Sequence, residues 1–204
     1  MKIRLVVIAI LSLIFISCSR DEQLAKNETF QEVFNDSEIR DLQVLFDFFN
    51  EEICARSNNE DLDDCYRHFL EKVKSQADSN YVILDISFQK QLNVYDQISD
   101  STLHQIWWKG WSRRPLVSTT DTFVYLNVYP PGKYYEFLDR LGDDYEIVQE
   151  YHDHIVSFGD YSPSLLTGVQ RSFEKFNISD IRVKFLFAIH YLTVNDHLWR
   201  EERW

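Results

Sequence analysis

The segment VKFLFAIHYL, from Val183 to Leu192, is the most informative part of the sequence for the fold. It lies within a longer segment, from about Ser179 to Arg200, in which apolar side chains occur on almost every side of a helix. A helix that is apolar all round is buried all round. The sequence therefore predicts a long helix that runs through the centre of the domain.

Two amphipathic segments earlier in the chain predict an αα-hairpin. Apolar residues recur at three- and four-residue steps over Ile39–Ile53, after Asp36-Ser37, where either residue can cap a helix. The same spacing returns over Leu62–Val73, and the polar residues 57–60 lie between the two segments. A short polar connection between two amphipathic helices makes them neighbours.

The rest of the chain predicts further helices and leaves room for short strands. Helices are expected over Ser101–Lys109, Lys133–Leu141, Asp143–Phe158 and Ser164–Phe176, the first two ending at Gly110 and Gly142 and the last one capped by Ser162-Pro163. The segments Tyr81–Ile86 and Phe123–Tyr129 are rich in β-branched and aromatic residues and could each form a strand. The sequence thus predicts an all-α single domain of about six to eight helices with one or two short strands at most.

Composition and charge narrow the classes of protein. The 204 residues are 45% hydrophobic and 15% aromatic, with only 5 glycines, which is typical of one packed globular domain. The formal net charge is -12. Such a chain repels nucleic acid and anionic lipid surfaces. Two interpretations of the acidity remain, a basic partner or simple solubility at a crowded surface.

The N-terminal segment has the layout of a secretory signal. Lys2 and Arg4 precede an apolar run from Leu5 to Ile16, which is shorter than the ~20 residues that span a membrane. Ser17 and Cys18 follow, and the sequence FISC resembles the lipobox of bacterial lipoproteins. The resemblance implies cleavage before Cys18, a thioether-linked diacylglycerol on its sulfur and an acyl chain on the new amino group. Several chains anchor a protein stably, whereas one binds only marginally.

The residues after Cys18 indicate which side of the outer membrane the protein faces. The segment from Ser19 to Gln23 resembles the short acidic tether that sends Bacteroidota lipoproteins to the outside of the outer membrane; a plain solvated linker is the alternative. We expect a signal peptide at 1–17, an acylated flexible tether at 18–35 and a helical domain at 36–204. The expected location is the outer membrane, lipid-anchored and at the cell surface, with the periplasmic face as the alternative. Loss of two basic residues with the signal would leave 19 basic and 33 acidic residues, a net charge of -14.

Cys54 and Cys65 remain as a pair once Cys18 is assigned to lipid. Outside the cytoplasm such a pair usually oxidises. Cys54 lies in the last turn of the first predicted helix and Cys65 in the opening turns of the second, so the helical hairpin brings them together. The sequence predicts a disulfide, against the alternative of two buried thiols.

The segment IWWKGWSRR, residues 106–114, combines aromatic and basic residues. It contains three of the five tryptophans, Trp107, Trp108 and Trp111, and the two arginines Arg113 and Arg114. The tryptophans could be core and cap residues at a helix end. Adjacent tryptophans cannot share one helical line, however, and tryptophan and arginine dominate binding hot spots. These five residues are therefore the candidate partner-binding site.

Motifs for catalysis and metal binding are absent from the sequence. His152 and His154 are two residues apart, whereas two zinc ligands on one helix are spaced three or four residues apart. His190 and His197 share one face of a helix, but no motif in the sequence supplies a third zinc ligand. There is no GxSxG elbow and no glycine-rich phosphate loop. We therefore assign no catalytic residue, metal or cofactor.

Three classes of function remain open. The first is an envelope lipoprotein that binds an unknown protein or glycan through a non-catalytic helical module. The second is an immunity-type protein that neutralises a basic toxin. The third is a cell-wall or glycan hydrolase, which would need a cleft with two facing carboxylates supplied by the fold.

Overall fold

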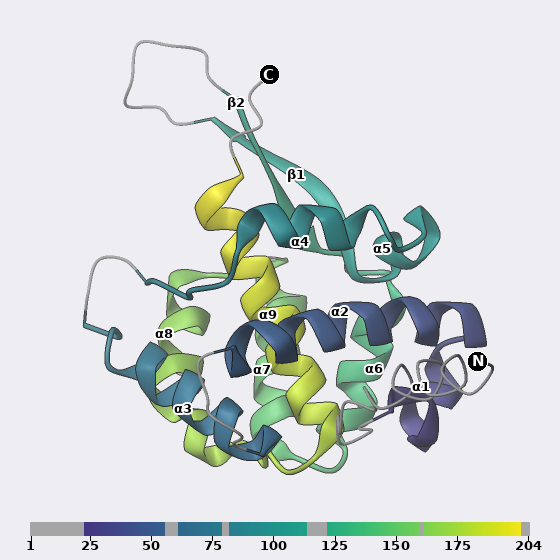
Figure 1. The fold of residues 1–204 in the computed structure, drawn as a ribbon, viewed down its shortest axis with the longest axis horizontal. Helices are drawn as coiled ribbons and strands as arrows, with labels where there is room; N and C mark the ends of the chain where they lie inside the picture. The colour runs from purple at the N-terminus through teal and green to yellow at the C-terminus, as the bar shows by residue number, and fades with distance from the viewer. Residues whose placement is uncertain (1–22, 56–60, 79–81, 114–121, 160, 201–204) are drawn as a thin grey trace, which may run out of the picture.

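The structure, a computed structural model, describes residues 23–55, 61–78, 82–113, 122–159 and 161–200. These residues form a mostly helical single domain with one antiparallel hairpin (Figure 1). The predicted fold class is confirmed. The elements are η1 (Leu24–Lys26), α1 (Glu28–Val33), α2 (Asp36–Cys54), α3 (Leu62–Lys74), α4 (Phe88–Tyr95), α5 (Asp100–Ile106), β1 (Trp107–Arg113), β2 (Thr122–Val128), α6 (Lys133–Gly142), α7 (Glu146–Phe158), α8 (Pro163–Ser172), η2 (Phe173–Lys175) and α9 (Ile181–Trp199).

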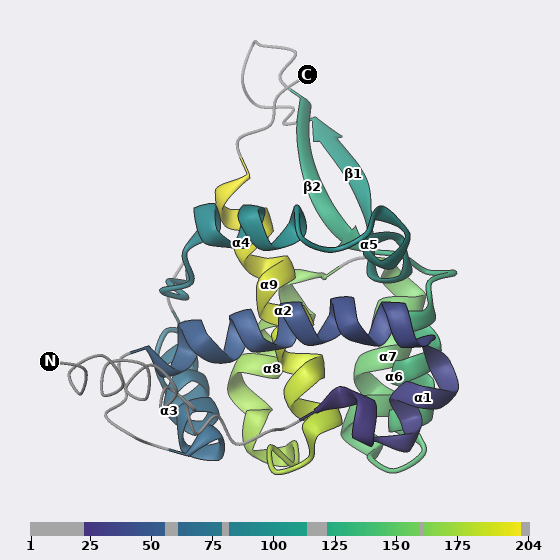
Figure 2. The same ribbon diagram turned by 45° about the vertical axis from the view of Figure 1, so that its right-hand side comes forward.

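Helix α9 runs through the centre of the molecule, as its sequence predicts. Every residue from Val183 to Asp196 is buried. α2, α4, α6 and strand β2 pack directly against it, and two views show the other helices arranged around it (Figures 1 and 2). The hairpin projects from the end of the molecule where α9 finishes.

The start of α2 is fixed by a capping box one residue earlier than expected. Asn35 is the cap, because its side chain accepts hydrogen bonds from the backbone N–H groups of Ser37 and Glu38. The Glu38 carboxylate in return accepts a hydrogen bond from the backbone N–H of Asn35 at 2.8 Å, and it forms an ion pair with Lys133 Nζ at 2.6 Å. The same carboxylate therefore caps α2 and ties it to α6.

The folded domain begins before residue 36. Leu24, Phe30 and Phe34 are buried, and the Phe30 ring packs against Phe137 and Phe185 of the core. Residues 24–35, expected in the tether, are therefore part of the domain, because their apolar side chains find a place against α6 and α9. Residues 1–22, which include Cys18, lie outside the described residues.

The hairpin corrects one predicted helix. The helix expected over Ser101–Lys109 ends at Ile106, and the chain continues as β1, paired with β2 in the register Trp107 to Val128 through Arg113 to Thr122. Gly110 is consequently a strand residue and not a cap; a Cβ there would lie 3.1 Å from the Tyr125 ring.

The two strands suggested by the sequence have different outcomes. The one at Phe123–Tyr129 is confirmed as β2. Residues 82–87 form no strand, and Asp85 has a φ of 56°, a left-handed conformation that interrupts extended backbone. Among the residues that the structure describes, no helix is long and apolar enough to cross a membrane.

Candidate functional site

Trp107 belongs to the core of the domain. Its side chain is 2% exposed, and its Nε1 donates a hydrogen bond to Thr193 Oγ1 of α9 at 2.7 Å. Thr193 in turn donates to the carbonyl of Ile189, and the Trp107 ring packs edge-on against Tyr95 at 5.4 Å. Trp107 therefore anchors the base of the hairpin and is unavailable to a partner.

Trp108 points the other way, because successive side chains in a strand alternate between faces. It is 40% exposed and lies opposite Asn127 in the register. Asn127 is buried, and its Nδ2 donates to the carbonyl of Gly159 at 3.0 Å, which fastens the end of α7 to the hairpin. Phe158, next to Gly159, is 65% exposed. Trp108 therefore lies across the hairpin from a buried asparagine whose hydrogen-bond partner directly follows the exposed Phe158; we call Trp108, Asn127 and Phe158 the hairpin–α7 surface.

The remaining residues of the predicted cluster are placed only in part. Trp111 and Arg113 belong to β1, where they pair with Val124 and Thr122. Their side chains, and all of Arg114, lie outside the described residues. Of the five candidates, the structure thus places the side chains of two, on opposite faces of the hairpin.

Strand β2 is held by the last turns of α9. Asp196 Oδ1 accepts the backbone N–H of Leu126 at 2.9 Å, and His197 Nε2 lies 2.6 Å from the carbonyl oxygen of Leu126. Arg200 pairs with Asp196 at 2.5 Å, so the buried carboxylate is neutralised. The hairpin is therefore fixed on the core on its β2 side, and the hairpin–α7 surface is preorganised.

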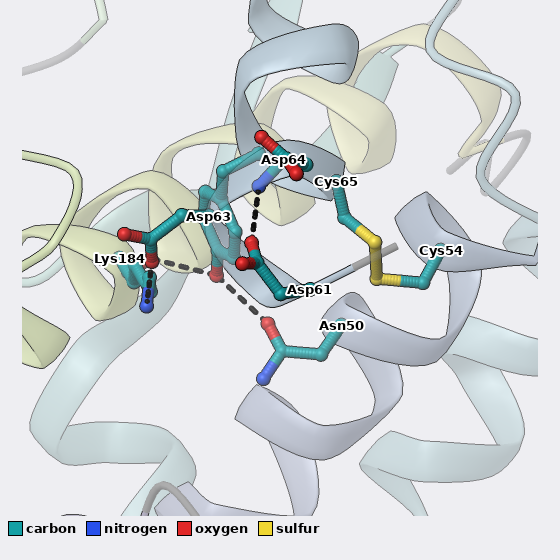
Figure 3. The surroundings of a disulfide bond; sticks show 8 residues. Asn50, Cys54, Asp61, Asp63, Asp64, Cys65 and Lys184 are labelled. Carbon is teal, nitrogen blue, oxygen red and sulfur yellow. Dashed lines mark hydrogen bonds and ion pairs between the residues drawn. A yellow bond between two sulfur atoms is a disulfide. The ribbon is translucent and has the colours of Figure 1, made fainter. Parts of the chain in front are cut away.

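The predicted disulfide joins α2 to α3 (Figure 3). Cys54 and Cys65 have Cα atoms 5.2 Å apart. Close to the bridge, the buried Lys184 of α9 pairs with Asp63 of α3 at 2.7 Å. Burial alone would raise the pKa of Asp63, but the hydrogen bonds from Lys184 and Ser179 and the charge of Lys184 hold this pKa below its ordinary value. The bridge and the ion pair together fix the helical hairpin on the central helix.

A buried cluster of tyrosines and one histidine was not predicted from the sequence. Tyr151 of α7 donates its hydroxyl proton to Tyr161 at 2.9 Å, and His190 Nδ1 lies 3.2 Å from the Tyr151 oxygen. Since Tyr151 has only one proton, His190 Nδ1 must be the donor to Tyr151. Burial, and to a smaller extent the neighbouring His197, lower the pKa of His190 to about 3. His190 is therefore neutral near pH 7.

The histidines do not converge on a metal site. His190 and His197 have the separate contacts described above, and His154 Nε2 lies 2.6 Å from Ser162 Oγ. Within the described part of the chain, no group of three or more His, Cys, Asp or Glu side chains is arranged to hold a metal ion.

Two pockets of about 240 Å³ each flank helix α8. The α7–α8 pocket is lined by Ile147, Glu150, Tyr151, His154, Ser164, Leu165, Gly168, Val169, Ser172, Lys175 and Phe176. The α8–α9 pocket is lined by Gln76, Ala77, Val82, Pro163, Leu166, Thr167, Gln170, His190, Tyr191, Val194 and Leu198. Among the described residues, the first is lined by one carboxylate, Glu150, and the second by none. The described linings of these two pockets therefore do not present the facing carboxylates that a glycoside hydrolase requires.

No protein-family model matches this chain, and no curated protein or solved structure matches it either. The residues that bear on function are therefore those of the chain itself. Among the described residues the candidates are the Cys54–Cys65 bridge, the hairpin–α7 surface and the two pockets beside α8.

One feature of the sequence could have indicated the buried cluster of tyrosines and His190. His190 and Tyr191 interrupt the apolar stretch of the central helix, where a polar group must find a partner or line a cavity. Phe158 gave no such signal, because an aromatic residue at the end of an amphipathic helix is usually packed. Phe158 is the last residue of α7, and Gly159, with a left-handed φ of 68°, ends the helix directly after it.

Proposed function

We propose that this protein is a lipid-anchored protein of the bacterial outer membrane and that its helical domain is a non-catalytic binding module for another protein. The hairpin–α7 surface is the proposed contact site. The observation that carries the proposal is the pair of exposed aromatic side chains, Trp108 and Phe158, on two elements joined through the buried Asn127. Rigidly held aromatic residues supply binding energy at little cost in conformational entropy.

The location rests on two features. The segment up to Cys18 resembles a lipoprotein signal, and a disulfide between Cys54 and Cys65 fits an oxidising compartment. The anchor would come from acyl chains on Cys18. Display at the cell surface, which the tether motif favours, is part of the same proposal.

The anchor is tested by comparing the wild-type protein with Cys18→Ala in the native host. We expect acyl mass on the wild-type N-terminal peptide and wild-type protein in the detergent phase. The variant should be released or remain unprocessed. A membrane-bound alanine variant beside an unacylated wild type would contradict the proposal. Protease treatment of intact cells then distinguishes surface display, where the domain is cut, from the periplasmic face, where it is protected.

The binding site is tested by crosslinking in intact envelopes followed by mass spectrometry of the captured proteins. Trp108→Ala and Phe158→Ala should each reduce capture of the same protein several-fold with little change in melting temperature. Ile83→Ala is the matched control, because Ile83 is a 50% exposed apolar residue outside the hairpin–α7 surface. Equal capture by all three variants would refute the site. Retention on cell-wall glycan that is lost in Trp108→Ala would instead make the partner a glycan.

A further inference from the structure

The two edges of the β1–β2 hairpin differ in how their backbone groups are used. On the β2 side, Asp196 accepts the N–H of Leu126 at 2.9 Å, and His197 Nε2 lies 2.6 Å from its carbonyl oxygen. Strand β1 lies on the side of the hairpin away from the end of α9 (Figure 2). Within the described part of the chain the sheet has only these two strands. The outer edge of β1 is therefore the edge to which a further strand could be added.

The hydrogen-bond pattern of the hairpin determines which groups β1 presents at this edge. In an antiparallel pair, residues that bond to the neighbouring strand alternate with residues whose N–H and C=O groups point away from it. Leu126 is of the second kind, since α9 holds both of its backbone groups, and its partner in the register is Lys109. Two residues further along β1, Trp111 is of the same kind, whereas Gly110 and Ser112 face β2. The backbone N–H and C=O of Trp111 therefore point outward from the hairpin.

The geometry and the charge of β1 indicate what kind of chain would fit. Backbone groups that recur at every second residue along an edge match the backbone of an extended chain, which is the basis of peptide recognition by strand addition. The seven residues of β1 include Lys109 and Arg113 and no acid. Opposite charges on paired strands are stabilising, and like charges are destabilising. An extended segment with acidic residues therefore fits this edge better than a second copy of β1, which would bring basic residues together.

We propose that an extended, acid-containing segment of another protein adds as a third strand along the outer edge of β1, with its backbone hydrogen-bonded to the N–H and C=O of Trp111. The inference rests on the proposed function, because it states how the protein partner is bound. The exposed Trp108 lies on the same strand. The added strand and the hairpin–α7 surface thus form one continuous contact site.

The test compares Trp111→Pro with Trp111→Thr in the envelope crosslinking experiment described above. Both variants lose the indole, but only proline lacks the backbone N–H. Proline is tolerated in an edge strand where the N–H does not bond to the neighbouring strand, so the hairpin should persist, with the Leu126 amide as protected from exchange as in the wild type. Trp111→Pro should capture the partner about 5-fold less than Trp111→Thr. Equal capture by the two variants would refute strand addition, whereas no capture by the wild type would refute the proposed function instead.

Hydrogen exchange of the wild-type protein tests the same edge without a substitution. When the captured protein is purified and added, exchange of the Trp111 amide should slow at least about 10-fold, because this N–H gains an acceptor in the added strand. The Gly110 amide, which faces β2, is the internal control and should slow less. An unchanged Trp111 amide in a complex that does form would refute strand addition. This measurement also decides the case in which Trp111→Thr itself abolishes capture or Trp111→Pro disrupts the hairpin.

Discussion

Asp196 accepts the backbone N–H of Leu126 at 2.9 Å, across 70 residues of chain. His197 meets the carbonyl oxygen of the same residue at 2.6 Å. Two side chains of the central helix thus occupy both backbone groups of Leu126 on the side of β2 away from β1. An exposed strand edge invites pairing with another chain. Here helix α9 takes the place that a third strand would occupy.

Asp196→Ala should be among the most destabilising single changes. It removes the buried carboxylate that pairs with Arg200 and that accepts the hydrogen bond of the Leu126 amide. We expect a loss of about 3–5 kcal/mol in the free energy of unfolding. Urea unfolding measures the loss, and native-state hydrogen exchange should show the Leu126 amide among the most accelerated. Glu136→Ala removes an exposed ion pair with Arg140 and should cost less than about 1 kcal/mol. Similar losses in the two variants would contradict this account.

His190 should make stability depend on pH below neutrality. Its folded pKa, about 3, lies below the ordinary value of 6.5, so the unfolded chain binds a proton that the folded chain does not. The contribution is therefore fully present above pH 6.5 and is lost as the pH falls towards 3, with a slope of up to about 1.4 kcal/mol per pH unit. His190→Gln should flatten this part of the curve, measured by urea unfolding at several pH values. His104→Gln, at an exposed position, is the control and should leave the curve as it is in the wild type.

The Cys54–Cys65 bridge should contribute about 2–3 kcal/mol, because it closes a short loop in the unfolded chain. Unfolding of the wild type with and without reductant measures this difference directly. The double variant Cys54→Ser, Cys65→Ser should match the reduced wild type and be insensitive to reductant. Labelling of the unreduced, denatured protein should find both thiols protected, and two reactive thiols would overturn the assignment.

The two adjacent tryptophans should respond differently to the same substitution. Trp107→Phe removes a buried hydrogen bond to Thr193 and part of a packed side chain, for a loss of about 1–3 kcal/mol. Trp108→Phe, at an exposed position, should change the free energy of unfolding by less than about 0.5 kcal/mol. Thermal or urea unfolding of both variants distinguishes the buried position from the exposed one. Losses of equal size would show that Trp108 is also part of the core.

Most of the long helices could be predicted from the sequence, because their buried faces are marked by regular apolar spacing. The short helix α4 could not, since Gln91 occupies one of its most buried positions. Gln91 Nε2 donates to the carbonyl of Leu192 at 2.9 Å, and Asn195 donates to Gln91 Oε1 at 2.8 Å. A buried polar residue whose hydrogen-bond partners lie on a helix far away in the chain cannot be told from a surface residue in the sequence.

The candidate surface was predictable only in part, for a related reason. Composition marks Trp108, but the local pattern predicts a helix there, because seven residues of strand directly follow a helix without a turn residue between them. Phe158 joins it through Asn127 and Gly159, 32 residues apart. A contact between residues so far apart in the chain leaves no local pattern in the sequence.

The central position of α9 also sets the order in which the chain can gain structure. α2, α4, α6 and β2 precede it in the chain, and each buries apolar side chains against it. A chain that is synthesised, or threaded through a translocation channel, from its N-terminus therefore exposes these faces until residues 181–199 follow. The apolar faces that α9 covers in the folded domain are open to aggregation during this interval.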